Sequence, residues 1–224
     1  MAEPGANSVV IGFSCHTGWA AAVAIAGPGD APRVAAKGRV TMATTFATGA
    51  VFHAGQGLPL AEAESFIRES EARFTGAARS AIEAFVDSLR DGGLVPVASV
   101  VVAGGAARPL PALEAILRSH PLVHSAEGDL YRRVIARASE ACALPVTLVP
   151  ARDLASRVAA AARLSEERVL SILAEAGKAS GRPWAKDQKD AALAAWLGLV
   201  ADPIAAGRGA SPRLRLLRGQ PDRA

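Results

Sequence analysis

The opening stretch of the chain, SVVIGFSCHTGWAAAVAI from Ser8 to Ile25, holds two apolar runs separated by a short loop that contains Gly18. Two such runs joined by a tight glycine-bearing loop predict an antiparallel β-hairpin. Alternation along the first strand places Ser14 and His16 on one face and Cys15 on the other, in the core, where a thiol is inert. The sheet is therefore expected to begin with antiparallel strands.

The remaining patterns alternate between strand and helix. A third antiparallel strand is expected at 33–42 and an irregular connection at 43–58. Short apolar runs predict two buried parallel strands, at 97–103 and 146–149. Helical spacing of apolar residues predicts helices at 59–90, 110–119, 125–143, 153–162, 165–176 (ended by Gly177) and 187–200. This order defines an α/β fold: a mixed five-stranded sheet, three antiparallel strands then two parallel, with helices on both faces.

Composition and charge favour one domain. The chain has 224 residues, half of them hydrophobic, which is enough for one substantial core. We expect a single domain at 8–202, a disordered N-terminus at 1–7 and a disordered basic tail at 203–224. That tail accounts for the whole net charge of +4, because it carries one acid and five arginines: Arg208, Arg213, Arg215, Arg218 and Arg223. This tail is expected to be a solubilising terminus, with weak, nonspecific nucleic-acid contacts as the alternative.

No membrane span or secretory signal is recognisable, which predicts a soluble, cytoplasmic protein with no membrane partner. The two cysteines, Cys15 and Cys142, are expected to be free thiols. A homo-oligomer is compatible with these features.

Two acids stand at the start of the last expected helix, in the segment DQKDAALA from Asp187 to Ala194. Their i, i+3 spacing puts Asp187 and Asp190 on one face of the first turn, and the small residues after them let the helix approach the sheet. The segment resembles the final-helix motif of the RuvC-type resolvases, which belong to the ribonuclease H-like superfamily. The resemblance implies a site where carboxylates hold Mg²⁺ or Mn²⁺ for phosphodiester hydrolysis.

The chain departs from that family at two positions. Ser14 stands where the first strand of the resolvases carries an aspartate, and the segment 98–103 contains no acid. The resemblance thus predicts an incomplete, degenerate nuclease site. The two acids also have a purely structural interpretation, with Asp187 as an N-cap and Asp190 opposing the positive end of the helix.

A second polar cluster lies at 124–133. Glu127 is a candidate for the missing carboxylate, and a ligand pocket near the strand ends is expected to gather further residues around His16. These are Ser14, Gly104, Gly105, Arg108, His124, Asp129 and Arg132. The alternative is an ordinary helix start, with Ser125 as N-cap and Glu127 and Asp129 in the first turn.

The histidines predict no metal centre. His120 and His124 have the i, i+4 spacing of a zinc pair, but Pro121 is expected to break the helix that would align them. His16, His53, His120 and His124 are all expected outside helix interiors, as ordinary loop residues.

Three function hypotheses follow. The first is a ribonuclease H-like domain with an incomplete nuclease site that binds nucleic acid or a protein partner. The second is a metal-dependent nuclease acting on structured DNA or RNA through Asp187, Asp190 and Glu127, with His16 as a further catalytic candidate. The third is a scaffold or oligomerisation domain related to actin-type ATPases, since Gly18 and Gly104-Gly105 lie near where those proteins hold phosphates.

Overall fold

A five-stranded mixed sheet forms the centre of the protein in a computed structural model, which describes residues 7–104 and 109–201. Its strands are β1 (Ser8–His16), β2 (Trp19–Ala26), β3 (Arg33–Thr41), β4 (Val95–Ala103) and β5 (Val146–Pro150). The order across the sheet is β3-β2-β1-β4-β5, with β1, β2 and β3 antiparallel and β4 and β5 added parallel to β1. The predicted α/β fold class is confirmed.

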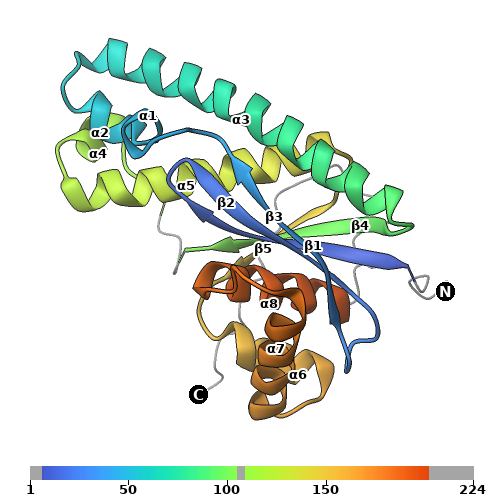
Figure 1. Cartoon of the computed structure of the whole chain (residues 1–224). Coiled ribbons are helices and arrows are strands. Elements are labelled where there is room, and N and C mark those ends of the chain that lie inside the picture. Colours follow the sequence, from blue (N-terminus) through green and yellow to red (C-terminus); the bar gives the residue numbers. More distant parts are fainter. Residues whose placement is uncertain (1–6, 105–108, 202–224) are drawn as a thin grey trace, which may run out of the picture.

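Helices cover both faces of this sheet (Figure 1). They are α1 (Phe46–Gly49), α2 (Val51–Gly55), α3 (Leu60–Asp91), α4 (Leu113–Leu117), α5 (His120–Ala141), α6 (Leu154–Ala162), α7 (Glu166–Ser180) and α8 (Lys186–Val200). The long helices α3 and α5 pack on one face, and α6, α7 and α8 pack on the other. No helix among the described residues is long and apolar enough to cross a membrane.

The last helix lies unusually close to the central strand, because both contribute small residues to their contact. A Cβ atom on Gly12 of β1 would overlap the carbonyl oxygen of Ala191 and lie 2.8 Å from the backbone nitrogen of Ala195. Ala191 and Ala195 are themselves fully buried. The absence of a side chain at Gly12 therefore sets how near the middle of α8 lies to the middle of β1.

Three local predictions were wrong. The segment 43–58 is not irregular, since it contains α1 and α2. Pro121 does not prevent a helix: α5 starts at His120, five residues before the expected N-cap Ser125, and the proline occupies the first turn, where its missing N–H has no helical partner to lose. Gly177 does not end α7 but lies inside it, under the Trp184 ring, which leaves no room for a Cβ.

The predicted N-cap role of Asp187 is also wrong. Helix α8 begins one residue earlier, with Ala185 as its N-cap and the Gln188 side chain accepting a hydrogen bond from the Ala185 N–H. Asp187 therefore has its carboxylate available for contacts outside the helix. Of the predicted terminal segments, 1–6 and 203–224 lie outside the described residues.

Candidate functional site

A pocket of about 300 Å³ opens at the carboxyl ends of the parallel strands. In sheets of this kind ligands gather at that edge, where loops and helix starts converge. The lining residues come from the ends of β1, β4 and β5 and from α5 and α8: Ser14, Cys15, His16, Val102, Ala103, Gly104, Arg132, Ala151, Lys186, Asp187 and Asp190. The structure thus brings Ser14, His16, Asp187 and Asp190 to one pocket.

His16 links the opening hairpin to α8. Its Nε2 lies 2.7 Å from Oδ1 of Asp187. The ring stacks on Trp19, with centroids 4.6 Å apart and planes 7° from parallel, and the Arg39 guanidinium lies 3.9 Å from the Trp19 ring centroid. Trp19 is on β2, which lies between β1 with His16 and β3 with Arg39, so its ring lies between those two side chains. This row of four side chains fixes the imidazole against the Asp187 carboxylate.

The second acid also has a partner. Lys186 donates to Asp190 one helical turn further along α8. The Asp190 carboxylate raises the pKa of the Lys186 ammonium, so the lysine stays charged at neutral pH. Both carboxylates of the DxxD motif are therefore engaged, one by an imidazole and the other by an ammonium.

Two of the lining side chains, Asp187 and Asp190, are carboxylates, the ligand type that divalent cations such as Mg²⁺ prefer. On the strands, the pocket is lined by the buried Ser14 of β1 and by Val102 and Ala103 of β4, which Gly104 follows, and none of these four residues carries a carboxylate. Among the described residues, Asp187 and Asp190 belong to no group of three ligand side chains whose donor atoms lie within 4.8 Å of one another. Asp187 and Asp190, paired with His16 and Lys186, are thus the carboxylates among the lining residues.

Arg132 brings a cation into the same pocket from α5. A Cβ on Gly104 would lie 3.4 Å from its guanidinium and one on Gly128 would lie 3.1 Å away, so this side chain packs beside two glycines. Arg132 has no carboxylate partner within the parts of the chain that the structure describes. Gly105 and Arg108, predicted to join this pocket, lie outside the described residues.

Three other predicted site residues do not line the pocket. Asp129 pairs with Arg133, which also contacts Glu71 of α3. Glu127 is buried and accepts hydrogen bonds from the backbone N–H groups of Phe52 and His53, at the start of α2. It satisfies helix-terminal donors that have no partner within a helix, and its carboxylate lies outside the residues that line the pocket.

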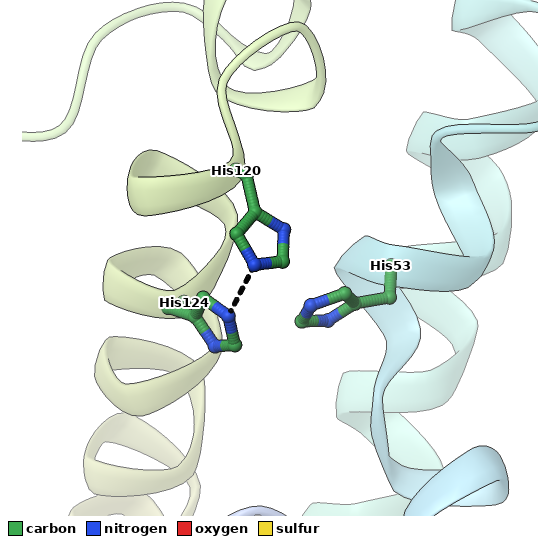
Figure 2. A group of neighbouring side chains, drawn as sticks. All are labelled: His53, His120 and His124. Carbon is green, nitrogen blue, oxygen red and sulfur yellow. Dashed lines mark hydrogen bonds between the residues drawn. The ribbon is translucent and has the colours of Figure 1, made fainter.

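His124 is the third of these residues. It lies beside His120 and His53 in a separate cluster (Figure 2). The sequence predicts no such cluster, since Pro121 is expected to break the helix; the signal for it is the i, i+4 spacing of His120 and His124 with proline at a helix start.

Cys15 lines the pocket edge but packs against the core on the α5 side of the sheet. Burial raises the pKa of its thiol to about 12, and the nearby Arg132 opposes that rise. The folded state favours the neutral thiol, whereas the unfolded thiol ionises with its ordinary pKa of about 8.5. The free energy of unfolding that Cys15 contributes is therefore complete at pH values below that pKa and is lost as the pH rises toward 12.

We therefore expect iodoacetamide at pH 8 to label Cys15 at least about 10-fold more slowly in the folded protein than in urea, because only thiolate reacts. Peptide mass spectrometry measures the rate, and Cys15→Ser identifies the signal of Cys142. Equal rates in the two states would contradict the assigned environment.

The strand order, the helices on both faces and the final helix against β1 define a ribonuclease H-like fold of the RuvC type. Two solved structures of RuvC from Thermus thermophilus share it: a complex with a Holliday junction substrate (TM-score 0.53, 12% identity) and a structure of RuvC (TM-score 0.51, 14% identity). Each comparison covers 88% of this chain and 96% of the RuvC chain. No protein-family model matches the sequence, and a search of curated proteins finds no match.

Proposed function

We propose that this domain binds nucleic acid at the pocket between β1, β4 and α8 and does not cleave it by two-metal chemistry. The pairing of both pocket carboxylates with His16 and Lys186 carries the proposal. The RuvC-like fold supports nucleic acid as the ligand class, since one of the similar structures is a complex with a Holliday junction.

The local charges support phosphate binding without metal ions. In a two-metal nuclease the cations offset the repulsion between the carboxylates and the phosphate. Here Lys186 and Arg132 carry two positive charges into a pocket with two carboxylates, so the charges of these four side chains sum to zero. Arg132, which has no carboxylate partner among the described residues, is the group best suited to a bidentate contact with a phosphate.

The proposal is tested by titrating the full chain into fluorescent four-way junction, duplex and single-stranded DNA at low salt. We expect anisotropy to report saturable binding in EDTA and in Mn²⁺ alike, because the contacts are made by side chains. Gel analysis of the same samples should show intact DNA. Absence of binding to all three substrates would overturn the proposal.

A second candidate is a metal-dependent nuclease that uses Asp187 and Asp190. The observation that favours it is their shared position in the pocket, one turn apart on α8. It predicts cleavage in Mn²⁺ that EDTA stops and that Asp190→Asn abolishes. Cleavage of that kind would replace the binding proposal with this one.

A further inference from the structure

Three histidines that are far apart in the sequence meet at the start of α5. His120 and His124 lie one turn apart on α5, and His53 faces them from α2 (Figure 2). One ring nitrogen from each lies within 4.8 Å of the other two, and Nε2 of His120 is 3.0 Å from Nε2 of His124. Two nitrogens bound to one tetrahedral zinc ion are about 3.3 Å apart, given Zn–N bonds of about 2.0–2.1 Å.

A buried carboxylate orients the third ring. Oε1 of Glu127 lies 3.1 Å from Nδ1 of His53, so Nδ1 carries the proton and the Nε2 lone pair is free to bind a cation. Metal-bound histidines commonly donate their other ring N–H to such a carboxylate, which fixes the tautomer and increases the basicity of the ligand. Glu127 is itself fixed by the N–H groups of Phe52 and His53.

The scaffold around the cluster is held in place from several sides. The Gln56 side chain donates to the Leu117 carbonyl at 2.8 Å, and the Tyr131 hydroxyl donates to the Gly49 carbonyl at 2.8 Å. These bonds tie the α1–α2 segment to α4 and α5, so the two sides of the cluster are positioned before any ligand arrives. His120 and His124 are exposed, which leaves an entry path from solvent.

We propose that His53, His120 and His124 form a binding site for one divalent transition metal, zinc by its preference for imidazole nitrogen, with Glu127 as the positioning residue and water in the fourth position. The hydrogen bond between His120 and His124 places a proton on one Nε2. That proton moves to the Nδ1 of the same ring, through solvent, when both Nε2 atoms bind the ion. The site is distinct from the DNA-binding pocket and does not depend on the proposed function.

The test is calorimetric titration of untagged, EDTA-stripped full-length protein with ZnCl₂, since an affinity tag would bind zinc itself. We expect saturation at one zinc per chain, lost in H120Q/H124Q and retained in H16Q, which removes the fourth histidine of the chain. Both sets of substitutions change exposed side chains, and circular dichroism verifies folding. No zinc binding, binding unchanged in H120Q/H124Q, or binding lost in H16Q alone would each overturn the proposal.

Glu127→Gln tests the positioning role. The amide oxygen can still accept the two backbone hydrogen bonds, but it lacks the charge that polarises His53. We expect zinc affinity to fall about 10- to 100-fold with the thermal unfolding of the metal-free protein little changed. Affinity equal to that of the unmodified protein would overturn the role assigned to Glu127.

Discussion

Gly12→Ala is expected to destabilise the domain by at least about 3 kcal/mol, the upper part of the range for forcing an extra methyl into a packed interior. The new Cβ would overlap the carbonyl oxygen of Ala191 and crowd the backbone nitrogen of Ala195. These are backbone atoms of α8, which cannot rotate away as a side chain would. The helix must move off the sheet, and Asp187 must then move away from His16.

Urea unfolding followed by circular dichroism measures this loss, and Gly76→Ala is the matched control. Gly76 lies in α3, exposed, with nothing within 4 Å of the position of a new Cβ. Alanine there should stabilise the protein by about 0.5–1 kcal/mol, because it is the better helix former. Similar unfolding midpoints for the two variants would contradict the close packing of α8 on β1.

Arg132→Gln is expected to weaken DNA binding about 10-fold at low salt, the loss of one good phosphate contact at about 1–2 kcal/mol. The slope of log affinity against log salt concentration should also become shallower by about one, because one fewer counterion is released. Glutamine retains hydrogen-bonding capacity and most of the volume, so the change isolates the charge.

The matched control is Arg79→Gln, which removes the same charge from an exposed position on α3. Arg79 pairs with Glu83 there, and α3 lies on the opposite face of the sheet from α8 (Figure 1). This substitution should leave both the affinity and the salt slope nearly unchanged. Equal losses in Arg132→Gln and Arg79→Gln would indicate a diffuse electrostatic effect and would contradict binding at the pocket.

Much of the sheet was predictable because its signals are local. The hairpin from Ser8 to Ala26 is encoded by apolar runs around a glycine with φ of +82° at position 18. The buried parallel strands are short β-branched runs, such as SVVV within β4. Their order in the sheet follows from the few topologies that join a meander to parallel strands through helices.

The wrong helix boundaries came from rules that consider only neighbouring residues in the sequence. Gly177 looked like a helix end, but Trp184 occupies the space above it, and no local pattern reports that contact. The rule that proline breaks a helix fails at Pro121, because proline in the first turn fits a helix well. That one error moved the start of α5 and concealed the histidine cluster.

The candidate site was predictable in part for the same reason. The spacing of Asp187 and Asp190 indicated a shared face, and the structure places both in one pocket with Ser14 and His16. Their partners were not predictable, because the contact of His16 with Asp187 spans 171 positions of the sequence. Glu127 is the opposite case. The sequence offers its carboxylate as a catalytic candidate, but in the structure it accepts hydrogen bonds from backbone N–H groups at the start of α2.

The most direct test of the central claim, that the proposed nucleic-acid pocket between β1, β4 and α8 does not form a two-metal centre, is a crystal structure of the protein soaked in Mn²⁺ with anomalous data. We predict that Asp187 remains hydrogen-bonded to His16 and Asp190 to Lys186, with no pair of manganese ions bound by the two carboxylates. Two manganese ions about 3.5–4 Å apart, held by Asp187 and Asp190 with His16 and Lys186 displaced, would contradict it.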